Sequence, residues 1–388
     1  MKRAIIECGA AETRAALLID DVVWKVWFGP ARGDEKIDEF PRAGRRFAGR
    51  VMRVDPGLAA AFLDLGDGQD AFLPLKKSNA AACVEGALLA VDIKSPPRQG
   101  KGALLRFAGA MHSGAPGRMP PYNDPVLDAA EAVARDADEL LVDDGAASRV
   151  LQSAGFHAAA HETHPVSLFV ANGVDGEFEA AFDRVAALSD GGRLVIDEAQ
   201  ALTAIDVDTG GLSASSPARL REKVALLAAN EAVRQVSLRK IGGHIVIDFP
   251  EITSDAGRNR FRDHLHKALS RLEGAGAASF SKSGLFSFNA PHRELSLLDR
   301  FTETAACDPV AGRRFTVDAL AKRAIAGLER NLRSAPSARY HLILREDVNA
   351  YLALQSRWTE RLVERFGARF EITAGMSEME QGFELSEQ

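Results

Sequence analysis

The stretch Leu202-Thr-Ala-Ile-Asp206-Val-Asp208 is a run of β-branched and aliphatic residues interrupted by aspartate, and His244-Ile-Val-Ile-Asp248 repeats the pattern. Such runs predict buried strands. Because strand side chains alternate between two faces, Asp206 and Asp208 point away from the aliphatic residues between them. A carboxylate at the end of a buried strand is costly unless its charge is neutralised. Two such strands side by side would bring three carboxylates to one edge of a sheet, which predicts a divalent cation site.

The bulk composition indicates a globular protein. The chain has 388 residues, of which 46% are hydrophobic and 26% are charged, and this length allows two or more domains. No run of about 18 apolar residues occurs, so we expect no contact with a membrane. The first residues resemble a strand rather than a signal peptide. Three scattered cysteines, Cys8, Cys83 and Cys307, indicate a reducing compartment, and we expect a cytoplasmic protein.

The chain contains one local basic segment. The net charge of the chain as a whole is −6, and this negative charge argues against nonspecific coating of nucleic acid. A solvated charged face is the ordinary explanation for such a segment. However, short strands separated by glycine turns overlap it and continue to Pro74, and this pattern is typical of a small β-barrel. The basic residues are Lys36, Arg42, Arg45, Arg46, Arg50 and Arg53.

The rest of the chain alternates between strand and helix patterns. Residues 1–30 read as paired strands with a turn at residues 20–21, and the Gly- and Pro-rich residues 108–125 predict a linker or a flexible loop. A small C-terminal αβ unit begins near Phe315, and we expect the acidic end from Glu378 onward to be frayed. Helices are predicted at 126–137, 217–240 and 256–272.

Several segments, taken in order, resemble the ribonuclease E/G family. The barrel segment is similar to an S1-type OB-fold, which is an RNA-binding module. A single motif would be weak, but an ordered set that covers most of the chain is specific. The other segments are Glu12–Asp20, Glu198–Gly210, Asn230–Gly243, Ile245–Phe249 and Leu344–Glu371.

This resemblance implies a multidomain α+β fold. An RNase H-like domain would be interrupted by the S1-type OB-fold barrel and followed by a DNase I-like catalytic domain and a small C-terminal αβ domain. The expected bounds are 1–36 and 155–186 for the RNase H-like domain, 37–105 for the barrel, 106–154 for a linker with a vestigial 5′ sensor, 187–305 for the catalytic domain, and 306–388 for a degenerate zinc link with the C-terminal domain.

The resemblance also implies a Mg²⁺-dependent endoribonuclease that cleaves single-stranded RNA to 5′-phosphate and 3′-hydroxyl products, in rRNA processing or RNA degradation. Asp206 and Asp248 match the two aspartates that hold the metal, and Asp208 stands where the family usually has asparagine. A carboxylate-held Mg²⁺ can position water and neutralise charge on a phosphate. The plainer alternative is that these are turn or capping aspartates. As a third catalytic-site residue, Asp208 would alter metal preference or rate, because its charge strengthens metal binding and repels phosphate.

RNA binding is expected on the barrel and near the cation site. Phe62 and Phe72 match aromatic residues that stack bases, although barrel core is the usual fate of an isolated phenylalanine. Base stacking on an exposed ring contributes about 1–3 kcal/mol per base. Lys101 matches a residue that contacts the RNA backbone, and nearby arginines would attract phosphate. The full set of candidate RNA-binding residues is Phe62, Phe72, Lys101, Arg50, Arg53, Lys282 and Arg293.

Three departures from the family pattern favour a rival hypothesis. The short stretch after Arg106 indicates that the 5′ sensor is missing or vestigial. Cys307 alone cannot supply the four sulfurs of the family's zinc link, so we expect no zinc and, if the chain forms a homodimer, one without that link. The segment 281–293 is less basic than in the family. The rival is a noncatalytic RNA-binding protein, such as an RNA chaperone or ribosome-associated factor, while retention of both metal aspartates favours the enzyme.

Overall fold

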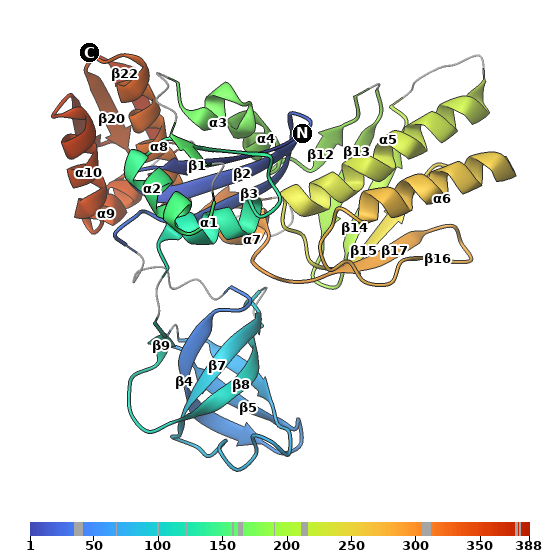
Figure 1. Cartoon of the computed structure of the whole chain (residues 1–388), viewed down its shortest axis with the longest axis horizontal. Coiled ribbons are helices and arrows are strands. Elements are labelled where there is room, and N and C mark those ends of the chain that lie inside the picture. The colour runs from blue at the N-terminus through green and yellow to red at the C-terminus, as the bar shows by residue number, and fades with distance from the viewer. Residues whose placement is uncertain are drawn as a thin grey trace. The chain divides into compact units, whose positions relative to one another are not determined.

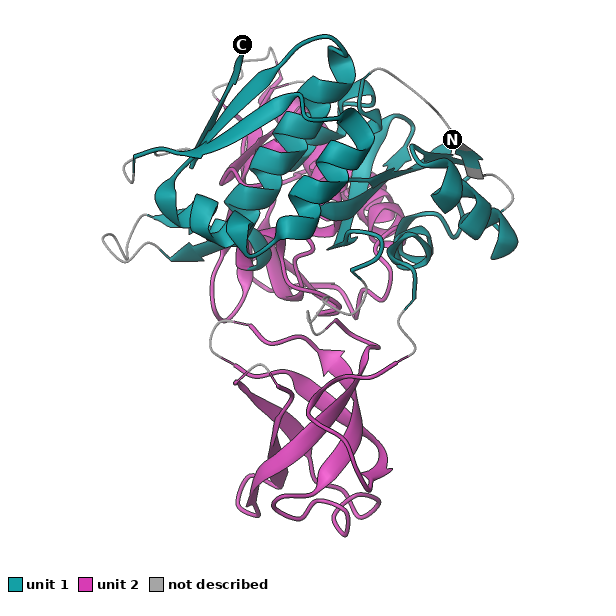
Figure 2. Ribbon diagram, turned by 90° about the vertical axis from the view of Figure 1, so that its left-hand side faces the viewer, with its two compact units in different colours: residues 1–38, 122–178, 300–388 teal, residues 39–121, 179–299 magenta. Residues whose placement is uncertain are grey.

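The computed structural model describes residues 1–34, 42–66, 68–98, 101–120, 123–156, 159–161, 166–189, 191–210, 216–304, 312–376, 379 and 382–388. The chain forms two compact units, each assembled from separate stretches of sequence (Figure 2). Unit 1 contains Met1–Asp38, Tyr122–Phe178 and Arg300–Gln388, and unit 2 contains Glu39–Pro121 and Glu179–Asp299. Within the described residues, helices that combine the length and the apolar character needed to span a bilayer are absent.

A mixed sheet in strand order β11–β10–β1–β2–β3 forms the first layer of unit 1 (Figure 1). β1 to β3 form an antiparallel meander whose β2–β3 turn, as predicted, lies at Asp20 and Asp21, both with positive φ. β10 runs parallel to β1, and α1 and α2 pack on the sheet with apolar residues such as Val126 and Leu151. The bounds are β1 (Lys2–Cys8), β2 (Glu12–Ile19), β3 (Val22–Pro30), α1 (Pro125–Val133), β10 (Glu139–Val142), α2 (Gly145–Ser153), β11 (Ala159–His161), α3 (Leu168–Ala171) and α4 (Val174–Ala180).

The C-terminal part of unit 1 packs α8 against a small sheet in the order β21–β20–β22. The expectation of a frayed acidic end is wrong for Glu384 and Glu387, which lie in β22 and pair with β20. The reason is alternation, because Phe383 and Leu385 face the apolar core while Glu384 points outward, and Glu387 is exposed as the last residue of the strand. The bounds are α7 (Leu297–Phe301), β18 (Thr302–Thr304), β19 (Arg313–Phe315), α8 (Val317–Ser334), β20 (Tyr340–Leu344), α9 (Glu346–Ala353), α10 (Ser356–Phe366), β21 (Phe370–Ala374) and β22 (Phe383–Glu387).

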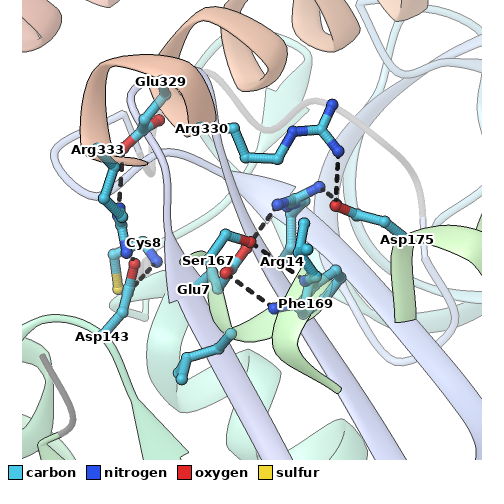
Figure 3. Close-up of polar contacts among 12 residues, drawn as sticks. Glu7, Cys8, Arg14, Asp143, Ser167, Phe169, Asp175, Glu329, Arg330 and Arg333 are labelled. Carbon is cyan, nitrogen blue, oxygen red and sulfur yellow. Dashed lines mark hydrogen bonds and ion pairs between the residues drawn. The ribbon is translucent and has the colours of Figure 1, made fainter. Parts of the chain in front are cut away.

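A network of buried charges surrounds the end of β1 in unit 1 (Figure 3). Arg14 donates to Glu7 at 2.5 Å and to Asp175 at 3.1 Å, and the backbone N–H of Phe169 donates to Glu7 at 3.0 Å. Burial opposes ionisation of Glu7, yet Arg14 and further hydrogen bonds hold its pKa below the ordinary value. Arg333 of α8 reaches the buried Asp143 at 3.0 Å. Because each carboxylate has a cationic partner, the network fastens α8 to the first sheet.

Unit 2 contains a closed barrel built from β4, β5, β6, β8 and β7, in which β5 also pairs with β4. This barrel is consistent with an OB-like domain. Its interior holds Leu63, Leu73, Leu89 and Leu105, each at most 2% exposed. The strands are β4 (Arg46–Asp55), β5 (Ala60–Asp64), β6 (Asp70–Pro74), β7 (Leu88–Ser95), β8 (Leu104–Met111) and a short β9 (Gly117–Arg118) that pairs with β4.

Residues 108–125, predicted as a linker or a flexible loop, contain the end of β8 and the short strand β9. The first of these residues complete β8, because Ala108 and Ala110 continue the outward-facing half of that strand after Arg106. β9, at 117–118, adds to the barrel, and β10 joins the first sheet beside β1. The glycines and prolines that indicated a loop therefore occupy only the connection between β8 and α1.

The second sheet of unit 2 carries the candidate cation site. Its strand order is β12–β13–β14–β15–β17–β16, and α5 and α6 cover one face (Figure 1). Ile205 and Ile247 are buried on the helix side, and both helices lie close to their predicted bounds. The bounds are β12 (Val185–Ala187), β13 (Arg193–Glu198), β14 (Thr203–Asp208), α5 (Pro217–Leu238), β15 (Gly243–Asp248), α6 (Asp255–Leu269), β16 (Ser279–Phe280) and β17 (Phe286–Ala290).

Candidate functional site

Asp206 and Asp248 lie side by side at the carboxyl ends of two adjacent strands. β14 and β15 are neighbours, as the sequence pattern predicted. The structure adds that they run parallel and that the two aspartates are register partners. Both side chains are exposed on the face that the helices leave open, and neither forms a hydrogen bond or ion pair with the described residues. Neighbouring strands lie about 4.8 Å apart. The fold therefore holds two like charges next to each other, and a cation between them would relieve their repulsion.

Asp208 has a different environment from the other two aspartates. Its register partner on β13 is Arg193, whose Nη2 and Nε lie 2.7 and 2.9 Å from Asp208 Oδ2. The backbone N–H of Gly210 donates to Asp208 Oδ1 at 2.9 Å. The hydrogen bond from Gly210 and the ion pair with Arg193 lower the pKa of Asp208. Both carboxylate oxygens of Asp208 are therefore engaged within the protein.

The donor set fits a hydrated Mg²⁺ held by two carboxylates. Mg²⁺ usually keeps several waters and takes one or two protein carboxylates rather than a complete protein cage. Asp206 and Asp248 supply two exposed oxygen donors at adjacent positions. Among the residues that the structure describes, groups of three or more His, Cys, Asp or Glu side chains close enough to hold an ion are absent. The predicted edge of three equivalent carboxylates is thus an adjacent pair plus an ion-paired neighbour.

The aspartate pair is exposed on the open face of the sheet, away from a pocket that other residues line. A pocket lies at the other end of the same strands, lined by Thr203, Gly243 and His244 among others, and neither Asp206 nor Asp248 lines it. Small-molecule sites are usually enclosed and mostly apolar. An exposed pair of carboxylates on a sheet is better suited to an extended polymer that lies across the surface.

The barrel presents two aromatic rings and an arginine together. Phe62 and Phe72 are register partners on β5 and β6, with ring centroids 5.8 Å apart and planes at 81°. Both are half-buried and alternate with the interior residues Leu63 and Leu73, so they belong to the outer face of the barrel. The Arg53 guanidinium carbon lies 4.1 Å from the centroid of the Phe62 ring. This arrangement offers a stacking surface in which Arg53 covers one face of Phe62.

The remaining basic candidates fall in separate places. Lys101 is exposed and follows the barrel strand β7, whereas Arg50 donates to the carbonyl of Gly86 at 3.1 Å. Lys282 is exposed in the β16–β17 turn, at the sheet end where β15 reaches Asp248. Arg293 follows the opposite end of β17 and pairs with Glu273 at 3.1 Å. Lys36 and Cys307 lie outside the described residues.

Arg193 is the residue of this site that the sequence pattern did not indicate. It begins β13, and a lone arginine at the start of a strand is usually a solvated surface residue. Only the register between β13 and β14 places it opposite Asp208. A prediction that these two strands form a hairpin, with its turn near Ala199, would have indicated the pairing, because register follows from turn position.

Comparison with known proteins places this sheet in a family. The family model described as "Ribonuclease E/G family" matches residues 126–288. Ribonuclease E of Escherichia coli K12 is 33% identical over 157 residues, covering 36% of this chain and 14% of that protein. These matches support membership of the ribonuclease E/G family. The match includes Arg193, Asp206, Asp208 and Asp248, and it ends before Arg293.

Two further relatives support the same placement. The ribonuclease E/G-like chloroplastic protein of Arabidopsis thaliana is 30% identical over 153 residues, covering 38% of this chain and 15% of that protein. Ribonuclease G of Escherichia coli K12 is 32% identical over 114 residues, covering 29% of this chain and 23% of that protein. The matched segments thus span less than a quarter of each of these ribonuclease E/G family members.

Proposed function

We propose that this chain is a Mg²⁺-dependent endoribonuclease. It would cleave single-stranded RNA to products with 5′-phosphate and 3′-hydroxyl ends, in RNA processing or turnover, including rRNA processing. The observation that carries the proposal is the in-register pair Asp206 and Asp248, exposed on a sheet that matches the ribonuclease E/G family model. The named functions of the ribonuclease relatives support the same class of activity.

The chemistry follows from the charges of the site. Asp206 and Asp248 would hold Mg²⁺, which when bound supplies a Lewis acid for a phosphoryl oxygen and lowers the pKa of bound water. Water would attack phosphorus and the O3′–P bond would break, which leaves the phosphate on the 5′ end of the downstream product. The exposed Lys282, in the turn at the Asp248 end of the sheet, would attract the adjacent phosphate. Phe62, Phe72 and Arg53 would hold bases of the same strand on the barrel, while Lys101 and Arg50 contribute positive charge there.

The domain assignments are part of the same proposal. The first sheet of unit 1 would be the RNase H-like domain, which the barrel interrupts in sequence, and the barrel would be of the S1 type. The sheet of unit 2 that carries Asp206 would be the DNase I-like catalytic domain. A cytoplasmic location, and a homodimer that lacks the usual zinc link, complete the proposal.

A cleavage assay on a labelled, AU-rich single strand tests the proposal. The wild-type chain should cut the strand with Mg²⁺ and not with EDTA, and the ends of the products should be a 5′-phosphate and a 3′-hydroxyl. Asp206→Asn and Asp248→Asn should each slow cleavage by about 100-fold or more, because each removes charge that acts in the transition state. Asp263→Asn is the matched control, since Asp263 is exposed on α6, on the covered side of the sheet.

The same assay identifies the rival function. RNA binding without cleavage, equal in the wild type, Asp206→Asn and Asp248→Asn, would show a noncatalytic RNA-binding protein. Cleavage that continues unchanged in both variants would place the active site elsewhere.

A further inference from the structure

The third aspartate of the site poses a problem of charge. Asp208 is two residues beyond Asp206 on the same face of β14, so the two side chains are about 7 Å apart. A free carboxylate there would raise the charge around the cation from −2 to −3. Such a site would bind a divalent ion more strongly but would repel the phosphates of RNA.

In the structure, Arg193 neutralises the extra negative charge of Asp208. Two guanidinium nitrogens of Arg193 lie 2.7 and 2.9 Å from Asp208 Oδ2, and the backbone N–H of Gly210 donates a hydrogen bond to Asp208 Oδ1 at 2.9 Å. Arg193 adds one positive charge, so the local sum returns from −3 to −2. A cation on Oδ2 would have to approach the guanidinium, which like-charge repulsion opposes.

Two glycines, one next to Arg193 and one close to Asp208, allow the two strands to approach closely enough for this contact. Gly192 and Gly210 both have positive φ, and a Cβ on Gly192 would lie 2.9 Å from the backbone oxygen of Asp208. A Cβ on Gly210 would lie 3.2 Å from Gly192. Any larger residue would separate the two strand ends, so these glycines permit the approach that brings Arg193 to Asp208.

We propose that Arg193 is a positioning residue of the cation site, which holds Asp208 out of the metal coordination sphere and cancels its charge. The Asp208–Arg193 pair then provides the net charge that a neutral amide at position 208 would provide. The inference rests on the proposed function, because it presupposes a cation between Asp206 and Asp248. The pair contributes little to folding, since its side chains are 54% and 35% exposed.

Mn²⁺ binding without RNA tests the proposal, with Mn²⁺ as the probe and free Mn²⁺ followed by its EPR signal. Four proteins are compared at low salt: the wild type, Asp208→Asn, Arg193→Gln and the double variant. One unit charge about 7 Å from a divalent ion changes its affinity about sevenfold in water-like surroundings. Asp208→Asn leaves Arg193 unbalanced and should weaken binding about sevenfold. Arg193→Gln frees Asp208 and should strengthen binding by a similar factor.

The double variant decides between the two roles of Asp208. If Arg193 compensates charge, the double variant returns to within about twofold of the wild-type affinity, and the single-variant effects shrink as salt rises. If Asp208 is a metal ligand, Asp208→Asn weakens binding by far more than sevenfold and the double variant stays well below the wild-type affinity, which overturns the proposal. Unchanged Mn²⁺ affinity in every variant would also overturn it.

Two controls keep the result interpretable. Arg314→Gln breaks a cross-strand pair with Glu303 that is comparably exposed, and it should leave Mn²⁺ affinity unchanged. Thermal unfolding of each variant separates a folding defect from a change in binding. A wild type that binds no Mn²⁺ would refute the proposed cation site itself, whereas Mn²⁺ binding with the wrong pattern among variants refutes only the role of Arg193.

Discussion

Replacement of the aromatic ring of Phe62 or Phe72 on the barrel should weaken RNA binding, and the neighbours of each ring determine the size of the loss. Phe62 has one face covered by Arg53 at 4.1 Å and stands edge-on to Phe72 at 5.8 Å. A base that stacks on the Arg53-covered face of Phe62 has to displace Arg53 or lie on its guanidinium, whereas Arg53 does not cover Phe72. Loss of one stacked base is worth about 1–3 kcal/mol, or about fivefold to 150-fold in Kd. We expect Phe72→Leu to fall within this range and Phe62→Leu to cause the smaller loss.

Fluorescence anisotropy of a labelled single strand, in EDTA at fixed salt, measures this effect without cleavage. Leucine is the better replacement because it keeps apolar contact on the barrel surface while it removes the flat ring. The T-shaped pair itself contributes about 0.5–1.5 kcal/mol, so thermal unfolding must accompany each titration. Wild-type affinity in both leucine variants, with an intact barrel, would refute base stacking and leave the rings as packing residues.

Three further predictions concern other charged groups. Lys282→Ala should weaken binding to all RNA sequences alike and reduce the slope of log K against log salt concentration by about 1. RNA titrations at several salt concentrations measure this slope. A loss of affinity that depends on RNA sequence would contradict a phosphate contact. Glu7→Gln, measured by urea denaturation, should lower the free energy of unfolding by about 1–3 kcal/mol, because Arg14 loses its more buried carboxylate partner but keeps Asp175 at 3.1 Å. Glu303→Gln in an exposed pair should change it by less than about 1 kcal/mol. Burial lowers the pKa of His292 from 6.5 to about 4. As pH falls from 6.5 toward 4, the unfolded chain therefore binds a proton at this histidine before the folded chain does, and the free energy of unfolding should decrease over this pH range. A pH profile of stability that is unaltered in His292→Gln would contradict this.

The sequence was sufficient for those parts of the site that depend on alternation within one strand. The run from Leu202 to Asp208 predicts both the strand and the outward direction of its aspartates, and the repeated pattern at His244 predicts a neighbour. The structure confirms that β14 and β15 are adjacent, and it shows that they run parallel. The helices α5 and α6 were also predictable, since their apolar spacing matches one covered face of a sheet.

Other features of the structure depend on how the strands pair, which the sequence of a single strand does not show. The partner of Asp208 is on β13, and only the antiparallel register decides whether Arg193 or a neighbour faces it. The end of the barrel was misplaced because small residues in β8 resemble a linker, although hydrogen bonds to β7 continue to Met111. The acidic C-terminal segment was misjudged for a similar reason, since its alternate apolar residues are recognisable only against the sheet they complete.

We propose that Asp206 and Asp248 together hold the metal that supports RNA cleavage. The most direct measurement is the single-turnover cleavage rate at saturating protein as a function of Mg²⁺ concentration, in the wild type and in Asp206→Asn, Asp248→Asn and the double variant. Residues that act as one site show strongly non-additive losses. We predict that the double variant is about as slow as either single variant, with RNA affinity in EDTA unchanged. Independent, multiplicative losses, or rates equal to the wild type, would contradict a shared metal site.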